Sequence, residues 1–462
     1  MTLHKDTEQS PLSAPTESSD AGPNKPNASP ISLKRLAIKG SAWVMFGFGM
    51  AQVLRLGGNV VLTRLLTPEV FGIMSIVGAL LMGLQMFSDV GLRPNIIQNP
   101  RGEEPVFIRT AWSIQVIRGF ILASLAAILA WPLAFINGEP SLVLITMVAG
   151  LTAIISGFHS TWLLVYYRRM VLNKLVFLDL TGQFLSIVVM VVCAWYFRSV
   201  WALVLGSFVG STVKLVASHT VLSGVPMRFL WEKEAVYELI RFGRWIFIST
   251  ALYFLAVRLD IFVFGSFAGM TMLGIFVLAK NLSRLVVEAL MKLSSTVLLP
   301  VYSRLAERST KALRTRTFKI RAVLLALFLP PLWAIILWGH HIIDFLYDDR
   351  YKDAGWMLQI FAAGAIATAI RATIEPVLLA VGNSFRHMIG TAIILCLQIA
   401  SMSVGAILAG VPGFVVGMAL TDWLYYPVLA YLIRPYGVWL PFLDAVAFGS
   451  SVVVIGLLWW MN

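Results

Sequence analysis

Long apolar runs, separated by short polar or charged segments, cover the chain from about residue 38 to its end. A helix needs about 20 apolar residues to cross the roughly 30 Å hydrocarbon core of a bilayer, and every run reaches that length. The strands of a membrane barrel would instead alternate in segments of about ten residues. The pattern therefore predicts thirteen membrane helices, at residues 38–62, 71–97, 109–135, 141–165, 175–197, 200–222, 240–265, 271–298, 320–345, 355–381, 387–409, 412–433 and 438–460.

The two ends of the chain and one internal turn depart from this regular pattern. Residues 1–30 are rich in Ser, Pro and Thr without periodicity, so we expect a disordered tail and no signal peptide. The turn at residues 410–413 (GVPG) is the weakest of the predicted boundaries. The last run, which ends in Trp459 and Trp460, is either a thirteenth span or a segment at the membrane interface.

The composition excludes a soluble globular protein. Hydrophobic residues make up 58% of the chain, and the mean hydropathy is +0.82. Charged residues make up only 13%, against about 25% in soluble domains. Even large soluble domains keep a polar surface, so this much apolar surface requires a bilayer.

The net charge of +13 is explained by the loops between the apolar runs. Nucleic-acid-binding proteins cluster their cations on one solvated face, whereas here Lys and Arg gather in alternate loops. Such a bias marks the cytoplasmic side, so we expect a cytoplasmic N-terminus in a multi-pass membrane protein, with no nucleic acid bound. The densest loop follows the eighth run and carries Arg304, Arg308, Lys311, Arg314, Arg316, Lys319 and Arg321.

Three markers recur in the two halves of the chain. Gly40 matches Gly243 and Arg55 matches Arg258 at one offset, and Gly72 matches Gly274 at an offset one residue shorter. Six runs separate the copies, and an even number of spans per copy gives a parallel repeat. We therefore expect an all-α membrane protein of 12–13 spans, with two pseudo-symmetric six-helix bundles around a central cavity. The predicted units are a tail at 1–30, bundles at 31–222 and 240–435, a cytoplasmic linker at 223–239, and an added C-terminal segment at 436–462.

Ionisable residues inside the apolar runs are the main functional candidates, because a charge in the bilayer must face protein or water. The cations outnumber the anions, so pairing among themselves cannot neutralise all of them. The full set is Arg55, Asp89, Arg93, Arg118, Asp179, Lys214, Arg258, Asp260, Lys280, Arg284, Glu288, Lys292, Arg371, Glu375, Asp422 and Asp444.

A polar stripe runs along the eighth apolar run. Its charged residues recur every four positions, which keeps them on one helix face, and that face must line a cavity or the seam between the bundles. Arg118 lies about 13 Å into its run at 1.5 Å per residue, and neither Arg118 nor Lys280 has a carboxylate at helical spacing. We predict a cationic substrate site formed by Arg118, Lys280, Arg284, Arg371, Arg55 and Arg258, with Asp89, Asp260 and Glu288 as candidate ion-coupling groups.

A purely structural explanation competes for several of these residues. Asp89 with Arg93, and Arg371 with Glu375, have the spacing of ion pairs that hold helices together. Arg55 and Arg258 lie toward the outer third of their runs, where a long side chain can reach the membrane surface.

Cysteine and histidine give no sign of a metal or a disulfide. Cys193 and Cys396 both lie in apolar runs, and the six His residues are scattered without a metal-binding spacing. We expect no cofactor, no metal and no enzymatic activity.

Several short motifs resemble one family. Residues 63–72 (TRLLTPEVFG) and 87–92 (FSDVGL) look like the opening of the Wzx-like lipid-linked oligosaccharide flippases, polysaccharide transporters of the MATE-like (MOP) superfamily. The second half agrees more loosely, through residues 273–276 (LGIF), 279–282 (AKNL) and 299–305 (LPVYSRL). The resemblance covers roughly residues 35–435.

The resemblance implies two six-helix bundles in a V shape that alternate access around a cationic cavity. It further implies a sugar repeat unit on undecaprenyl pyrophosphate as the substrate, moved from the cytoplasmic to the periplasmic leaflet for exopolysaccharide, capsule or O-antigen. Membrane lipids, and the polysaccharide polymerase and export machinery, are the further partners it suggests. An intramembrane cationic site fits a pyrophosphate independently, because fixed cations can replace its hydration.

Two other functions stay open at this point. A cation-coupled multidrug antiporter of the same superfamily would need an acidic or neutral cavity, which the excess of Arg and Lys opposes. A membrane glycosyltransferase or polymerase would need a sizeable outer loop with acidic residues, and the loops here are short. A lipid scramblase or a channel is a more distant alternative.

Overall fold

The computed structural model describes residues 30–88, 91–294, 298, 302, 310–437 and 439–461, and these residues are almost entirely helical. Within these ranges no β-strand occurs. The first half contains α1 Pro30–Leu65, α2 Pro68–Phe87, α3 Leu92–Gln98, α4 Pro105–Asn137, α5 Ser141–Gly150, α6 Thr152–Gly157, α7 Trp162–Arg168, α8 Leu172–Phe197 and α9 Trp201–Thr220. The second half contains α10 Lys233–Leu293, α12 Thr310–Leu346, α13 Ala354–Ile374, α14 Pro376–Ala380, α15 Ser384–Ile433 and α16 Pro441–Met461.

Ten of the described helices are long and apolar enough to cross a membrane, or eleven if the bent α5–α7 segment is one span. Two of these helices are hairpins. The chain reverses at Gly269 in α10 and at Gly410 in α15, where φ is +78° and +59°, conformations that glycine adopts without strain. Across the turn of α10, Phe264 stacks on Phe276 with ring centroids 4.3 Å apart.

The predicted apolar runs agree with this architecture. Among the described residues most of the thirteen lie on one helix, on the bent α5–α7 segment or on one limb of a hairpin. Run 71–97 instead covers α2 and most of α3, and run 355–381 covers α13 and α14. The turn predicted at residues 410–413 begins at Gly410. The prediction of an all-helical membrane protein is therefore confirmed. α10 begins at Lys233, so its first two turns lie inside the predicted linker.

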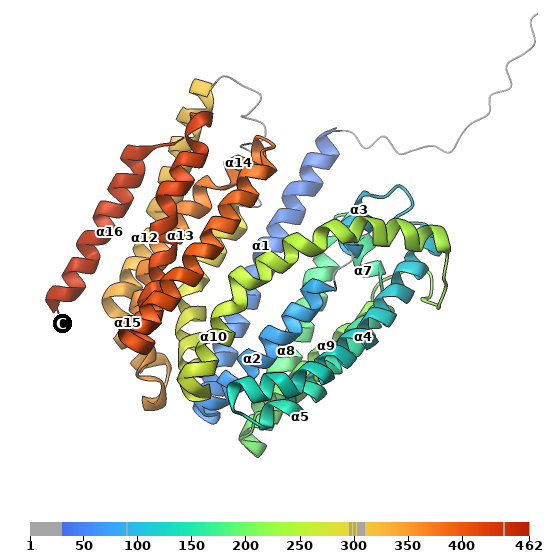
Figure 1. Ribbon diagram of the computed structural model, residues 1–462. Helices are drawn as coiled ribbons and strands as arrows, with labels where there is room; N and C mark the ends of the chain where they lie inside the picture. Colours follow the sequence, from blue (N-terminus) through green and yellow to red (C-terminus); the bar gives the residue numbers. More distant parts are fainter. Residues whose placement is uncertain are drawn as a thin grey trace, which may run out of the picture.

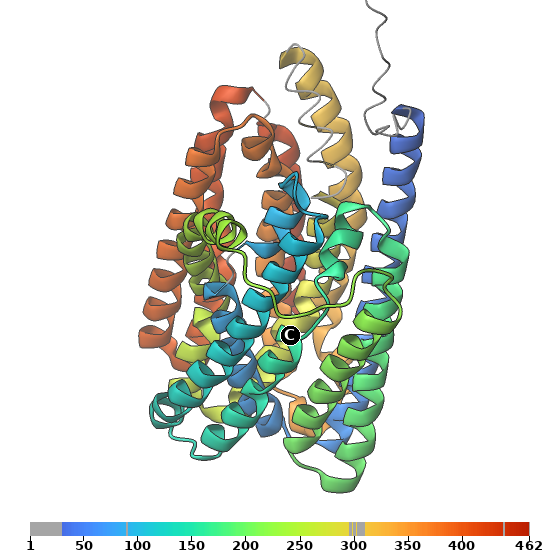
Figure 2. The same cartoon turned by 90° about the vertical axis from the view of Figure 1, so that its right-hand side faces the viewer.

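The helices of the two halves lie side by side, with α10 between them (Figure 1). In the first half α8 packs against both α1 and α9, and α4 packs against α5 and α6. In the second half α13 packs against α12 and α15, and α16 lies on the outside against α12 and α13. The view turned by 90° shows the same division into bundles of roughly parallel helices (Figure 2).

The halves meet in a close contact between α2 and the second limb of α10. A Cβ atom at Gly72 would overlap the carbonyl oxygen of Met270, and one at Gly274 would overlap the carbonyl oxygen of Pro68. The sequence repeat that matches Gly72 with Gly274 also matches Pro68 with Met270. The two contacts are therefore related to each other by a local two-fold axis. We call Pro68, Gly72, Met270 and Gly274 the glycine seam.

A network of ion pairs lies at the other end of α2, beyond α3. The Arg101 guanidinium binds Glu104 at 2.9 Å, Glu232 at 2.8 Å and Glu238 at 3.4 Å. Glu232 immediately precedes α10 and Glu238 lies in its first turns, so the network ties the loop after α3 to the start of the second half. Glu103 lies in the same loop, and Arg169, at the end of α7, donates a hydrogen bond to it that lowers the pKa of that carboxyl below its usual value.

α16 is joined to its bundle by a buried ion pair. Arg321 of α12 bonds to Asp444 of α16, and both side chains are 1% exposed. Tyr426 also donates a hydrogen bond to Asp444, at 2.7 Å. The prediction that Arg321 is a loop cation was wrong, because α12 begins before it and carries it into the protein interior.

Candidate functional site

The site is built around the break between α6 and α7, where the chain bends by 62°. A break frees backbone carbonyls that water cannot reach inside a bilayer, so other groups must bind them. The amide nitrogen of Gln115, on α4, donates to the carbonyls of Ser156, Gly157 and His159 at 3.1–3.2 Å. The amide has two N–H groups, so one of them is shared between two of these carbonyls, and one side chain links all three across the bend.

Two more side chains complete this arrangement. Trp112 of α4 donates its indole N–H to the carbonyl of Phe158 at 3.3 Å, and a ring nitrogen of His219 lies 3.0 Å from the same oxygen. The ring of His159 turns toward α9, where it lies 3.1 Å from the carbonyl of Ser211. The break is therefore held by hydrogen bonds from α4 and α9 on either side.

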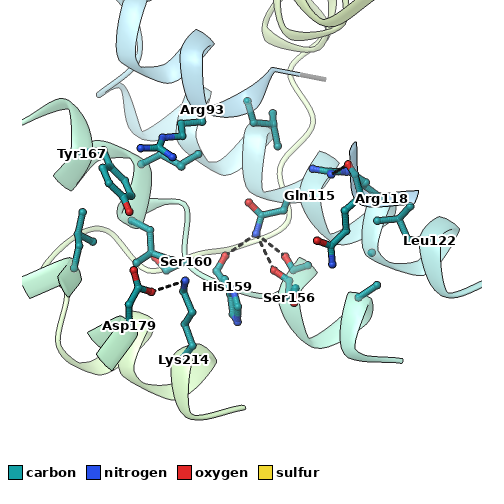
Figure 3. A pocket seen from close by; sticks show the side chains of 18 residues that line it. Arg93, Gln115, Arg118, Leu122, Ser156, His159, Ser160, Tyr167, Asp179 and Lys214 are labelled. Atoms are coloured by element: carbon teal, nitrogen blue, oxygen red, sulfur yellow. Dashed lines mark hydrogen bonds and ion pairs between the residues drawn. The ribbon is translucent and has the colours of Figure 1, made fainter. Parts of the chain in front are cut away.

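A pocket of about 470 Å³ opens beside this break, inside the first half of the protein. Figure 3 shows Gln115 in the middle of the pocket, Arg118 on one side, and Tyr167 with the Asp179–Lys214 pair on the other. The polar lining residues are Gln85, Arg93, Gln115, Arg118, Ser156, His159, Ser160, Tyr167, Asp179 and Lys214.

The pocket carries an excess of positive charge. Its lining includes three fixed cations, Arg93, Arg118 and Lys214, and one carboxylate, Asp179. Lys214 binds Asp179 at 2.7 Å, and the Arg93 guanidinium lies over the ring of Tyr167, 4.1 Å from its centroid. The net charge of the lining is therefore positive, and it lies next to an aromatic face.

Arg118 is a predicted site residue that the structure places in this pocket. Its Nε donates to the hydroxyl of Ser88 at 2.8 Å, and its Nη2 donates to the carbonyl of Gln85 at 2.5 Å. Both of these partners are uncharged, and the two hydrogen bonds hold the guanidinium in position.

Lys280 lies elsewhere, between the two limbs of α10. Its ammonium group bonds to Asp260, and the two side chains are 7% and 0% exposed. Lys280 has no carboxylate at helical spacing, but the turn at Gly269 brings Asp260 across from the other limb. This ion pair leaves Lys280 little capacity to bind a ligand. The other partner of the pair, Asp260, is one of the candidate ion-coupling residues.

The other predicted cations do not join the pocket lining. Arg55 is exposed on α1, and Arg258 donates to the sulfur of Met82 at 3.2 Å. Arg284 is half-buried on the second limb of α10, and Glu288 accepts a hydrogen bond from Gln52 of α1 at 2.9 Å.

Arg371 binds two carboxylates in the second half. Its guanidinium lies 2.8 Å from Glu375 and 2.9 Å from Asp422. The helix-joining ion pair considered for Arg371 and Glu375 is therefore present. Asp89, the third candidate coupling group, lies outside the described residues.

Sequence reasoning missed most of the pocket. Lys214 and Asp179 were recognised as intramembrane charges but not assigned to the site. Gln115 precedes Arg118 by three residues and so shares its helix face, which was an available signal. Nothing in the sequence pattern marked the break before α7 that brings His159 and Ser160 into the lining.

Solved structures of a flippase and of a multidrug transporter share the fold of this chain. The lipid II flippase MurJ, in an inward closed conformation, is 14% identical with a TM-score of 0.71, over 92% of this chain and 93% of that one. An inward-facing multidrug resistance MATE family transporter of the MOP superfamily is 13% identical with a TM-score of 0.64, over 92% and 98% of the two chains.

Sequence comparison places the chain more narrowly. The profile of the family described as "Polysaccharide biosynthesis protein" matches residues 61–355, and the chain belongs to that family. Lipopolysaccharide biosynthesis protein WzxC of Escherichia coli (strain K12) is 20% identical over 438 residues, 89% of this chain and 86% of WzxC. Succinoglycan biosynthesis transport protein ExoT of Rhizobium meliloti (strain 1021) is 23% identical over 278 residues, 60% of this chain and 56% of ExoT.

Proposed function

We propose that this protein is a flippase that moves a polyprenyl-pyrophosphate-linked oligosaccharide from the cytoplasmic to the periplasmic leaflet of the bacterial inner membrane. The observation that supports this most is the net positive pocket inside a helical bundle of the MOP fold. A pyrophosphate entering the membrane loses its hydration, and charge-assisted hydrogen bonds from Arg and Lys can replace it. The names of WzxC and ExoT place those relatives in lipopolysaccharide and succinoglycan biosynthesis, which agrees with such a substrate.

In this mechanism Arg118 and Arg93 bind the pyrophosphate, and the Tyr167 ring contacts the first sugars. The lipid tail stays in the bilayer. The two halves rock against each other, and the glycine seam separates when the pocket opens to the periplasm. Release there requires weaker binding in the outward-facing state, because a ligand held equally in both states shifts no population.

The charge of the pocket argues against a multidrug antiporter that exports cations. Such a protein needs carboxylates in its binding site, and the described lining holds one carboxylate, Asp179, already paired with Lys214. The proposed transport needs no bond chemistry from the protein, so it is a transporter and not an enzyme.

The test is a complementation assay in a strain that lacks its own copy of this protein. We expect Arg118→Ala to reduce surface polysaccharide at least tenfold at equal protein abundance, with lipid-linked repeat units accumulating in the cytoplasmic leaflet. Arg55→Ala is the matched control, because Arg55 is an exposed cation on α1 outside the pocket. Undiminished export by Arg118→Ala, or an equal loss in Arg55→Ala, would contradict the assignment of the pocket.

A further inference from the structure

A second group of charged side chains lies in the second half, remote from the pocket. It comprises Arg371, Glu375, His387 and Asp422, which we call the C-half cluster. Arg371 binds Glu375 at 2.8 Å and Asp422 at 2.9 Å, and Nδ1 of His387 lies 3.6 Å from Glu375. The side chains of Arg371, Glu375 and Asp422 are only 16–17% exposed.

The C-half cluster has an unbalanced charge. With a neutral imidazole it contains one guanidinium and two carboxylates, which leaves one net negative charge in a mostly buried place. Thr368 donates to Asp422 and stabilises it without adding charge. A buried net charge is costly unless it is compensated, and one added proton brings the cluster to neutrality.

The neighbouring charges do not provide this compensation. The nearest ion pair, Arg321 with Asp444 from α12 and α16, neutralises itself. Arg386, next to His387, donates to the carbonyl of Leu432 and stacks on the ring of Tyr436. Tyr425, from the second limb of α15, is an uncharged neighbour. Among the contacts described, α10 adds no ion pair to the cluster.

His387 is positioned to take the proton. Its Nδ1 is buried and makes no hydrogen bond among the described residues, and it lies 3.6 Å from a carboxylate oxygen of Glu375. Imidazole is the side chain that ordinarily changes charge between about pH 5 and 8. A bound metal is a poorer candidate, since the described residues contain no group of three His, Cys, Asp or Glu that could hold one, and the guanidinium already lies between the carboxylates.

The cluster joins three separate segments. Arg371 and Glu375 lie at the end of α13, His387 lies on the first limb of α15, and Asp422 lies on the second limb. A proton on His387 creates an ion pair with Glu375, which draws the first limb of α15 toward α13. The charge of one residue thus changes the packing of the helices in the second half.

We propose that the C-half cluster is a proton-binding site whose occupancy shifts the equilibrium between the two orientations of the halves. This inference rests on the proposed function in one respect: it supplies the bias that release of a lipid-linked headgroup requires. The ligand is a proton, held by a histidine and two carboxylates around one arginine.

The experiment measures the separation of the halves as a function of pH. Spin labels are attached at Glu69→Cys and Thr271→Cys, two exposed positions beside the glycine seam, in a full-length protein with Cys193→Ser and Cys396→Ser. We expect the distance distribution in lipid nanodiscs to shift between pH 8 and pH 5. His387→Gln and Glu375→Gln should both abolish the shift, because neither variant can form the ion pair between His387 and Glu375. Asp422→Asn should move the shift to lower pH, because its cluster is neutral before it takes up a proton.

Asp344→Asn is the matched control, since Asp344 is an exposed carboxylate on α12, and it should keep the wild-type response. Size-exclusion chromatography identifies any variant that does not fold, and the three cluster variants test the site separately. No shift in the wild type, or a wild-type shift in both Glu375→Gln and Asp422→Asn, would overturn the proposal. So would a distance change caused by replacing potassium with sodium at constant pH.

This result is separable from the proposed function. If the protein did not flip lipid-linked glycans, cells that carry Arg118→Ala would have a normal amount of surface polysaccharide. The pH-dependent distance change would nevertheless persist. If only the proton site were wrong, the pocket variants would still lose export and the distances would not respond to pH.

Discussion

Gln115 stabilises more of the functional site than any charged residue described in it. A single amide group binds three carbonyls at the α6–α7 break, where water is excluded. Losing such a donor leaves buried acceptors without partners, which costs about 1–3 kcal/mol for each group. The shape of the pocket therefore depends on an uncharged side chain, while in the proposed mechanism Arg93 and Arg118 bind the anion.

We expect Gln115→Leu to lower the thermal unfolding midpoint in detergent and to reduce transport together. Leucine has a similar size but cannot donate, so the break would relax. Gln183→Leu is the control, because Gln183 donates one hydrogen bond, to the carbonyl of Ala51. A midpoint for Gln115→Leu equal to that of Gln183→Leu would show that the three bonds do not hold the bend.

At the residue scale, the sequence pattern predicts which residues share a face of one helix, and it does not predict contacts between helices. Arg118 could be found because its depth follows from its position in an apolar run. The sequence pattern offered no carboxylate partner for Lys280, because helical spacing reveals only neighbours on the same limb. Asp260 reaches it through a turn whose geometry the sequence pattern does not specify.

At the scale of elements, the close contacts of the protein are made by helix ends and hairpin turns. The glycine seam allows the backbones of α2 and α10 to touch, which any side chain at Gly72 or Gly274 would prevent. The apolar runs predicted the helices and their limits well. They did not predict the bend of α5–α7, because its cause is a set of hydrogen bonds from α4 and α9.

Gly72→Ala and Gly274→Ala should each hold the seam apart and shift the spin-label distance to longer values. The two changes should have similar effects, since the local two-fold relation gives each glycine the same surroundings. Gly78→Ala is the control, because a Cβ atom there meets no atom within 4 Å. Unchanged distances in both seam variants would contradict the contact.

The attachment of α16 gives a second prediction at this scale. Asp444→Asn would leave the buried Arg321 without a counter-charge, and breaking a buried pair in this way costs about 3–5 kcal/mol. We expect a clearly lower unfolding midpoint in detergent, largely restored by combining Arg321→Met with Asp444→Leu. Lys352→Ala, which removes a well-exposed pair with Asp349, should change the midpoint little.

At the scale of the whole molecule, the described pocket belongs to one half and the C-half cluster to the other. The sequence predicted two related halves from three repeated markers, and one of these marker pairs lies at the glycine seam. It did not predict that the positive charge would gather in the first half, because four of the six proposed cations come from the second. Their ion pairs depend on tertiary packing.

Different forces hold the two halves together at the two ends of the molecule. At one end Arg101 directly contacts three carboxylates in partly exposed ion pairs, which dissolved salt weakens. At the other end backbone atoms touch at Gly72 and Gly274, and such contacts do not respond to dissolved ions. Ionic strength should therefore weaken the contact at only one of the two ends. Protein purified in concentrated salt should favour the orientation in which the halves are separated at the end that contains Arg101.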